Sequence, residues 1–458
     1  MIFLRFDARP NRPSGQNIFV GAVLALYVAA NAMFVIAYGL MGIQGNSVIT
    51  AGYLITCEMA VLYLTFRPIR PQVTDTLFGL FLLSAALSFL INGRTASAKD
   101  TALFVIALGA YPSLRCLSFT QPRMQQSFIL VTASIVALGT ILTAYAMVTQ
   151  WGGPYVRPLV LGVNDAAATF FLMACGLLII GVTATGLDRR KSLLLSAFVF
   201  LPAFVFSASL VRATFMAIIA TLVLNLVLAE AKQRIHFAVV IGVFLVSIVL
   251  GLTPRHLFTN GTARTSAEMF GPAEIVTPVH VAAIEIAAPA QIEMPTFSGP
   301  VYPGRKKKDV TTETLGNAPP SCTANVNMGD SVAIREALVR DALWLLPSAG
   351  LFGFGFGNFA SMTCLETEVH NSYLQALIEF GWISGICVGA ALLITLYRLI
   401  PHYRSSDGAR FAISGLTYVA MLSAAHGILS EDRLLFAMLG IAAATYETLA
   451  RGVRGSES

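Results

Sequence analysis

A histidine and three polar side chains stand at regular intervals in the segment VHNSYLQALIEFGWISG, residues 369–385. Asn371, Gln375 and Glu379 follow one another every four residues, which places them on one side of a helix. His370 precedes this helix, where the positive end of the helix dipole disfavours a protonated ring. The histidine is therefore a candidate to accept a proton near pH 7. The alternative is a histidine that only caps the helix or lies at an interface.

A second candidate is an arginine on an otherwise apolar helical face. The stretch DSVAIREALVRDALWLLPSAG predicts an amphipathic helix over about 331–346, which ends at Pro347. Arg335 lies near the centre of the apolar face, whereas Arg340 lies on the polar side. An arginine in that place is costly unless an anion or a carboxylate meets it. Arg335 is therefore either half of a buried ion pair or a clamp for an anionic ligand.

These residues belong to a chain with the composition of a membrane protein. Of its 458 residues, 56% are hydrophobic and 12% are charged, and the mean hydropathy is +0.73. Soluble globular proteins carry about 25% charged residues, so an ordinary soluble fold is excluded. Apolar runs recur along the chain, each near the roughly 20 residues that a helix needs to cross a bilayer. The sequence predicts an all-α, polytopic membrane protein.

We expect about twelve transmembrane helices, with one large outer loop between the ninth and the tenth. Residues 1–254 hold nine spans, 255–370 form the loop, and 371–458 hold three spans and a cytoplasmic tail. The first half of the loop is rich in Pro, Thr and Ala without a sustained period, which predicts irregular structure. The first span is too long for a cleaved signal peptide. The predicted spans are 17–39, 47–66, 76–92, 101–119, 126–149, 164–185, 192–209, 213–230, 236–253, 373–400, 411–428 and 434–450.

The orientation follows from the unequal distribution of Lys and Arg between the two sides. One side carries seventeen of them and the short connections of the other side carry five, so the positive-inside rule places both termini in the cytoplasm. The net charge of +6 is thereby accounted for, and nucleic acid is not expected as a partner. The seventeen are Arg5, Arg9, Arg12, Arg67, Arg70, Arg115, Arg123, Arg189, Arg190, Lys191, Lys232, Arg234, Arg398, Arg404, Arg410, Arg451 and Arg454; the five are Arg94, Lys99, Arg157, Arg212 and Arg433.

Two more polar stretches fall on the outer side. The connection within FSASLVRATFMAI is so short that Arg212 lies at or just inside the membrane surface. Arg212 either reaches lipid phosphates or lines a polar cavity of the bundle. The stretch GGPYVRPLVLGVNDAAATFF brings Arg157 and Asn164 to the outer end of the sixth span, in a loop rich in Gly and Pro.

The outer loop also contains two cysteines and two glutamates. Cys322 and Cys364, in an oxidising compartment, are either joined by a disulfide or left as two free thiols. Glu366 and Glu368 would share one face of an extended segment with His370, but no further ligand completes a metal site. One glutamate that orients the imidazole is the better interpretation. No Cys or His spacing predicts zinc, and we expect no metal and no cofactor.

Taken in their order along the chain, these stretches resemble the O-antigen ligase and O-antigen polymerase superfamily of bacterial envelope proteins. HNSYL followed by EFGWISG is similar to the family's His-Asn-x-x-Leu and Glu-x-Gly-x-x-Gly signature, and SVAIREALVRDALWLLPSAGLFGFGFGNF resembles its loop helix. The spacing of Arg157 and Asn164, an arginine after the seventh span, and the layout of twelve spans also recur in the family. The chain departs from it at 209–212, because Leu210 and Val211 separate Ser209 from Arg212 where the family commonly has Ser-Arg adjacent.

The resemblance implies inverting glycosyl transfer, without metal or nucleotide sugar, at the periplasmic face of the bacterial inner (cytoplasmic) membrane. The donor would be a glycan on undecaprenyl pyrophosphate, and the acceptor a hydroxyl of lipid A core or of another glycan. His370 would accept the proton of the acceptor hydroxyl or orient it. Arg212 and Arg335 would bind the pyrophosphate and stabilise its growing charge. The substrate-binding candidates are Arg157, Asn164, Asn371, Gln375 and Glu379.

The sequence is also compatible with other functions. A repeat-unit polymerase for O-antigen or exopolysaccharide would carry the same motifs as a ligase. A twelve-span transporter of lipid-linked sugar or another solute predicts an internal repeat and broken helices near the midplane, neither of which the sequence shows. Glu58, an acid within the second span, is a residue that a transporter would use. A non-catalytic scaffold leaves His370, Arg212 and Arg335 without a shared purpose.

Overall fold

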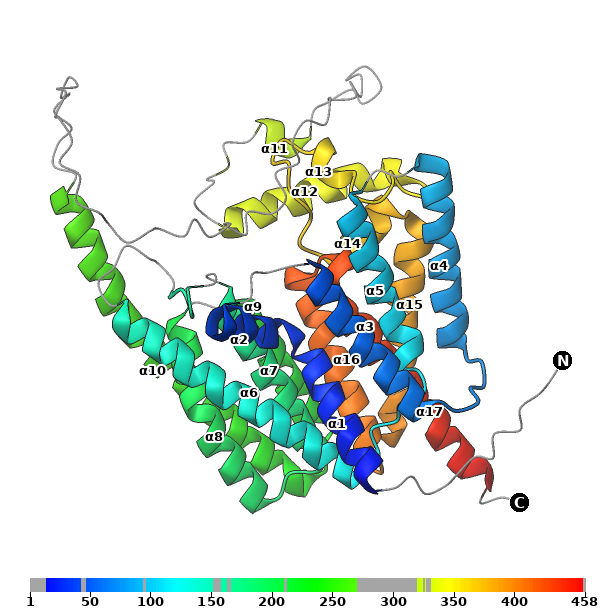
Figure 1. The fold of residues 1–458 in the computed structure, drawn as a ribbon, viewed down its shortest axis with the longest axis horizontal. Helices are drawn as coiled ribbons and strands as arrows, with labels where there is room; N and C mark the ends of the chain where they lie inside the picture. Colours follow the sequence, from blue (N-terminus) through cyan, green and yellow to red (C-terminus); the bar gives the residue numbers. More distant parts are fainter. Residues whose placement is uncertain are drawn as a thin grey trace.

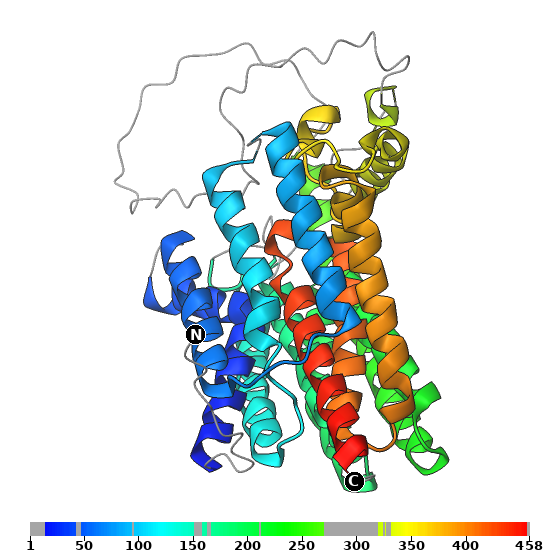
Figure 2. The same ribbon diagram turned by 90° about the vertical axis from the view of Figure 1, so that its right-hand side faces the viewer.

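The computed structural model is all-α over the residues it describes, which are 14–42, 47–93, 96–150, 158–162, 166–209, 212–269, 319–323, 326 and 331–455. These residues form a bundle of long helices with a group of short helices at one end (Figures 1 and 2). The helices of the first 269 residues are α1 Ser14–Val28, α2 Ala30–Met41, α3 Ser47–Thr65, α4 Val73–Asn92, α5 Ala98–Leu114, α6 Pro122–Thr149, α7 Ala167–Ala184, α8 Arg189–Ala208, α9 Arg212–Leu228 and α10 Ala231–Met269. The later ones are α11 Pro320–Thr323, α12 Ser331–Ala349, α13 Phe359–Met362, α14 Ser372–Glu379, α15 Trp382–Leu399, η1 Ile400–His402, α16 Asp407–His426, η2 Leu429–Glu431 and α17 Arg433–Gly455.

The all-α prediction is confirmed, and the long apolar helices indicate a multi-pass membrane protein, but the described residues do not show all twelve expected spans. Within the described residues, eight helices are long and apolar enough to cross a membrane: α3, α4, α6, α7, α8, α10, α15 and α17. A bent pair, α1 and α2, raises the number to nine if it counts as one span. The other expected spans are helical too, but α5 and α9 have 17 residues each, and α16 carries charged residues in its first turn.

The first expected span is broken, which the sequence did not predict. α1 and α2 meet at Ala29 with a bend of 76°, although neither Pro nor Gly stands there. The face of α2 that holds Ala30, Ala32 and Val35 is buried, and this helix packs against α6 and α7. The bend thus lets α2 cover neighbouring helices instead of continuing straight.

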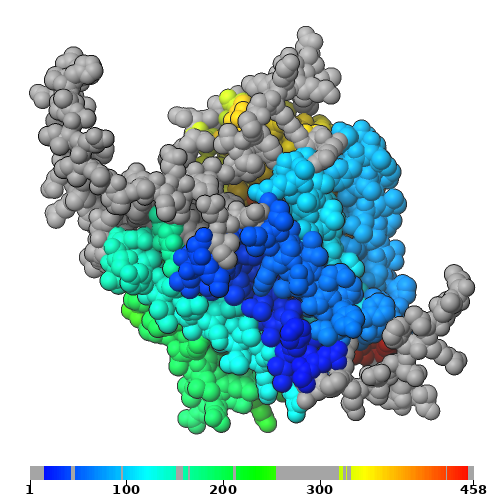
Figure 3. Space-filling view, in the orientation of Figure 1, coloured from blue at the N-terminus to red at the C-terminus, as the bar shows by residue number. Residues whose placement is uncertain are grey.

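Outward-facing apolar side chains are frequent on the long helices. Tyr63 on α3 is 84% exposed, Leu90 on α4 is 79% exposed and Ile141 on α6 is 65% exposed. Figure 3 shows one broad face of the molecule, formed by the blue to green helices of the N-terminal half. In a soluble protein such side chains would be buried, whereas a lipid environment stabilises them.

Arginines and their partners gather at one end of the bundle, which we call the basic end. Arg115 is fully buried there and pairs with Asp75 and Glu447, each at 2.7 Å. Arg67 donates to the carbonyl of Ala444 at 3.1 Å, which ties the end of α3 to α17. Further arginine donors to carbonyl oxygens at this end are Arg404 to Leu228, Arg410 to Ala184 and Arg451 to Pro68. These arginines, which the sequence assigns to one side, have their partners at the same end of the bundle.

The helix α12 and the short helices α11 and α13 lie at the other end, which we call the loop end, away from the C-terminal end of α17 (Figures 1 and 2). α12 packs into a small apolar core. The buried residues of this core are Leu338, Ala342, Leu345, Phe359, Val369 and Ile378. The expected helix over 331–346 is present but continues to Ala349, because Pro347 lies inside α12 instead of ending it. The expected tenth span, 373–400, is divided into α14 and α15.

A glycine turn accounts for that division. Gly381 adopts a φ of +88°, and a Cβ at this position would lie 2.1 Å from the carbonyl oxygen of Leu351. Gly353 adopts a φ of +69°, and a Cβ there would lie 2.4 Å from the backbone of Glu379. Only glycine permits both conformations and so close an approach. The glycine-rich stretch after α12 is therefore packed directly on the junction of α14 and α15.

Candidate functional site

His370 lies at the loop end, two residues before α14, and its side chain is half-buried. Its neighbour Val369 is fully buried in the small core beneath α12, which anchors the backbone next to the histidine. The N–H of Asn371 donates to the carbonyl of Val369 at 2.8 Å and closes a tight turn around His370. The imidazole thus stands on a fixed stretch of backbone at the entrance to a helix, as the sequence predicted.

Arg335 is half-buried on α12, and its charge acts on His370. Burial lowers the pKa of His370, and the positive charge of Arg335 lowers this pKa further. An imidazole with a lowered pKa is neutral near pH 7 and can accept a proton. Two of the three residues for which the sequence predicts catalytic roles therefore interact electrostatically in the structure.

The third, Arg212, is described only in part. Its backbone begins α9, while its side chain lies outside the described residues, as do Arg157 and Asn164 entirely. α9 packs against α16, and so does α14, the helix that follows His370. α16 is therefore a common neighbour of α9, which begins with Arg212, and of α14, which follows His370.

Asn371 is engaged with the backbone of its own helix. It is the N-cap of α14, and its side-chain oxygen accepts hydrogen bonds from the N–H groups of Tyr373 and Leu374, both at 3.0 Å. Its side-chain nitrogen donates to the carbonyl of Ala424 at 3.0 Å. These contacts fasten the start of α14 to α16. The geometry gives Asn371 an anchoring role beside His370.

The rest of the polar stripe faces inward. Gln375 is 1% exposed and Glu379 is 0% exposed. Gln375 donates from Nε2 to Glu379 at 3.0 Å and to Glu368 at 3.4 Å, and its Oε1 accepts from the N–H of Leu429 at 2.7 Å. In this structure the two stripe residues are enclosed by protein, so they act on the site through the elements they connect.

Glu368 belongs to this buried network. The sequence favours a glutamate that orients the imidazole, but Glu368 is hydrogen-bonded to Gln375 instead. Burial raises the pKa of Glu368 to about 7, and the negative charge of Asp100 adds to the effect. Burial, together with the charge of Glu368, also raises the pKa of Glu379. Two carboxyl groups that share one buried amide therefore retain a proton near neutral pH.

The sequence missed the contribution of the connection between α16 and α17. Asp432 accepts a hydrogen bond of 2.6 Å from the hydroxyl of Ser372, the first residue of α14. The 3₁₀ turn η2 immediately before it packs against α5 and α14. The signal was present in the sequence as the charged run Glu431, Asp432 and Arg433 between two apolar segments. Polar residues on both sides of α14 thus hold it in place.

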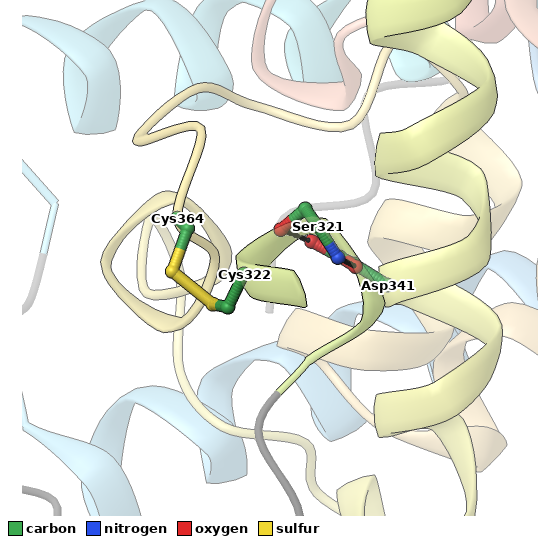
Figure 4. The surroundings of a disulfide bond; sticks show 4 residues. All are labelled: Ser321, Cys322, Asp341 and Cys364. Atoms are coloured by element: carbon green, nitrogen blue, oxygen red, sulfur yellow. Dashed lines mark hydrogen bonds between the residues drawn. A yellow bond between two sulfur atoms is a disulfide. The ribbon is translucent and has the colours of Figure 1, made fainter. Parts of the chain in front are cut away.

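The structure joins Cys322 and Cys364 by a disulfide, 42 residues apart in the chain (Figure 4). The sequence left open whether these two cysteines are bonded or free, and the structure has the bonded alternative. Cys364 lies six residues before His370. The disulfide therefore connects α11 directly to the segment that leads into the candidate site.

Among the residues that the structure describes, no group of three or more His, Cys, Asp and Glu side chains could hold a metal ion.

No protein-family model matches the chain, and no curated protein matches it either. The resemblance to O-antigen ligases and polymerases rests on the motifs quoted from the sequence.

Proposed function

We propose that the chain is a metal-independent, inverting membrane glycosyltransferase of the O-antigen ligase type. It moves a glycan from undecaprenyl pyrophosphate to an acceptor hydroxyl of lipid A core or of another glycan. The observation that carries the proposal is the action of the Arg335 charge on the half-buried imidazole of His370. A base that is neutral at physiological pH stands beside a cation suited to an anionic leaving group.

In the proposed reaction, the neutral imidazole of His370 takes the proton from the acceptor hydroxyl. The freed oxygen attacks the anomeric carbon of the donor sugar on the face opposite the pyrophosphate, which inverts the configuration. The bond between that carbon and the pyrophosphate oxygen breaks, and undecaprenyl pyrophosphate leaves with the electron pair. The guanidinium of Arg335, together with Arg212, stabilises the charge that grows on the leaving oxygen.

The proposed setting is the bacterial inner membrane, with the loop end in the periplasm. We infer that α5, α9 and α16 complete twelve spans with the bent pair and the eight longer helices, and that both termini are cytoplasmic. The collection of arginines at the basic end supports this orientation. The Cys322–Cys364 disulfide supports it as well, because disulfides persist in the oxidising periplasm.

A repeat-unit polymerase for O-antigen or exopolysaccharide would use the same base and the same cations. The two activities differ in the acceptor. Cells that lose a ligase accumulate lipid-linked polymer, whereas cells that lose a polymerase accumulate single lipid-linked repeats. The lipid-linked intermediates of a deletion strain therefore distinguish them.

One observation favours transport as a second candidate function. The bend of 76° between α1 and α2 is a broken span of the kind that transporters use for binding sites. Next to it, the hydroxyl of Tyr27 donates to the carboxylate of Glu58 at 2.8 Å. Transport of a lipid-linked sugar would depend on Glu58, whereas transfer would depend on His370. Glu58→Gln and His370→Ala thus separate the two functions.

The experiment that tests the proposal is the exchange of His370, Arg335 and Arg212, one at a time, for Ala. Surface glycans and undecaprenyl-linked intermediates are then profiled in cells that contain equal amounts of each variant. His402→Ala and Arg340→Ala are matched controls, since His402 lies at the basic end and Arg340 is an exposed partner of Glu336 on α12. We expect the three site variants to lose the surface glycan and the controls to keep it. Normal glycans in all three would remove the proposal.

A further inference from the structure

α11 is a helix of four residues that is attached on two sides. On one side, the backbone N–H of Ser321 donates to the carboxylate of Asp341 at 2.9 Å, and the Ser321 hydroxyl donates to the same carboxylate. On the other side, Cys322 forms the disulfide with Cys364 (Figure 4). We call these four residues, Ser321, Cys322, Asp341 and Cys364, the α11 clamp.

The α11 clamp connects the two elements that carry the candidate catalytic residues. Asp341 stands on α12, six residues after Arg335, and Cys364 stands six residues before His370. Asp341 is 0% exposed and Ser321 is 7% exposed, so their hydrogen bonds are shielded from competing water. A continuous path of covalent and charge-assisted bonds therefore runs from the helix of Arg335, through α11, to the segment of His370.

The segment before His370 has few other restraints on its backbone. Between Thr363 and Glu368, all of them described, the one internal backbone hydrogen bond runs from Glu366 N–H to the carbonyl of Thr363, at 3.5 Å. Glu366 also adopts a φ of +50°, which is unfavourable for a residue with a side chain. The small core anchors Val369, but apolar packing is not directional. Gln375 holds the Glu368 side chain, and the disulfide is the covalent restraint on the backbone between Cys364 and Glu368.

We propose that the α11 clamp positions Arg335 relative to His370 for the transfer reaction. This inference rests on the proposed function for its role in catalysis. The position of Arg335 relative to His370 does not rest on it, because the distance to a cation affects the protonation of the imidazole whatever reaction the protein catalyses. A displacement of about 1 Å can cost about a hundredfold in rate. The four clamp residues are positioning residues and make no contact with substrate.

The first test removes the disulfide from the full-length protein in lipid nanodiscs with the double variant Cys322→Ser/Cys364→Ser. Cys387→Ser, a change at a buried cysteine of α15, is the matched control. With a lipid-linked glycan as donor, we expect kcat to fall about tenfold in the double variant and KM to change less than twofold. A reductant should lower kcat of the wild type and of Cys387→Ser, but it should not affect the double variant further.

The second test does not require activity. The rate at which diethyl pyrocarbonate modifies His370 is measured by peptide mass spectrometry as a function of pH. In the wild type the midpoint should lie below the ordinary imidazole pKa of about 6.5, and in the double variant it should rise toward that value. Asp341→Asn, which keeps the disulfide, should shift the midpoint in the same direction by less.

The outcomes separate the two proposals. Wild-type kcat and an unchanged His370 midpoint in a double variant that elutes as a folded protein would overturn the positioning role. A shifted midpoint in a protein whose wild type transfers no glycan would support the clamp and reject the proposed function. If the double variant does not fold, the reductant on the wild type and Asp341→Asn give the same comparison.

Discussion

Gln375 donates a hydrogen bond of 3.0 Å from Nε2 to Oε2 of Glu379, one turn later on α14. The same Nε2 lies 3.4 Å from a carboxylate oxygen of Glu368, which precedes the helix. One amide thus bridges two acids in a largely buried place. The bridge connects the turn before His370 to the glycine stretch that packs on Glu379, so the charge of these acids affects how firmly the candidate site is held.

The first prediction concerns Glu368 and pH. Its pKa of about 7 in the folded protein is above the ordinary glutamate value of about 4.3, so the folded state binds more protons between these two values. The stability of the loop end should therefore fall as pH rises from about 4.3 to about 7. Hydrogen exchange of the α14 amides, corrected for intrinsic rates, should show less protection at pH 8 than at pH 5. Glu368→Gln should reduce the difference, and Glu379, whose pKa is raised as well, accounts for what remains. A difference as large as in the wild type would show that Glu368 is not responsible.

The second prediction concerns Arg335 and the pH dependence of transfer. Arg335→Ala removes a cation that lowers the pKa of His370, so the midpoint of the acid limb of kcat/KM should move to higher pH. It should also lower kcat/KM at pH 7 by about a hundredfold, since a charged donor to the leaving group is lost.

Arg340→Ala is the control for this change. Arg340 is 63% exposed and pairs with Glu336 on the outer side of α12. Its loss should therefore leave the midpoint of the acid limb unchanged and kcat/KM at pH 7 within about twofold of the wild-type value. Initial rates between pH 5 and pH 9 measure both the midpoint and kcat/KM. A midpoint that stays unchanged in Arg335→Ala would show that the two side chains do not interact.

The third prediction concerns the stability of the basic end. Arg115 is 1% exposed and satisfies Asp75 at two oxygens, at 2.7 and 2.9 Å, and Glu447 at 2.7 Å. Arg115→Ala would remove the buried cation that Asp75 and Glu447 share, and we expect a loss of about 3 to 5 kcal/mol in unfolding free energy. The exposed Arg123 is the control, and its change to Ala should cost less than about 0.5 kcal/mol. Urea unfolding in detergent measures both, and equal stabilities would contradict the prediction.

The fold was predictable from the sequence where hydropathy decides it. Apolar runs of the length of a bilayer predicted where the long helices of the bundle lie, although α10 continues to Met269, beyond the expected end of its span at residue 253. The arginines predicted the basic end. Three features were not predictable, because they depend on contacts between distant residues. The bend at Ala29 has no Pro or Gly, the continuation of α12 through Pro347 needs the core beneath it, and the break at Gly381 results from its packing on Leu351.

The candidate site was predictable only in part, because some of its contacts also join residues that are distant in the chain. The polar stripe of α14 was correctly assigned to one face, but periodicity does not tell whether that face meets a substrate or the charged connection at Asp432. The interaction of Arg335 with His370 joins α12 to the start of α14 through space, so spacing along the chain cannot reveal it. The pairing of Cys322 with Cys364 was one of two alternatives until the structure placed them together.

The fourth prediction tests the orientation. Ser348 is exposed at the loop end, and Ser405 is exposed at the basic end between η1 and α16. Introduced singly as Ser348→Cys and Ser405→Cys, the first thiol should react with a membrane-impermeant maleimide in intact cells. The second should react only after the cytoplasmic membrane is permeabilised. The opposite pattern would place the loop end in the cytoplasm and remove the periplasmic setting.

The most direct test of the central claim is the transfer rate of purified protein with His370 exchanged for Ala. An undecaprenyl-pyrophosphate-linked glycan and an acceptor are supplied in the presence of a chelator, and released undecaprenyl pyrophosphate is measured. We predict transfer by the wild type and by His402→Ala, and a loss of at least about a hundredfold in His370→Ala, since a general base contributes about 10² to 10⁴ in rate. A His370→Ala protein that transfers glycan at the wild-type rate would contradict the account.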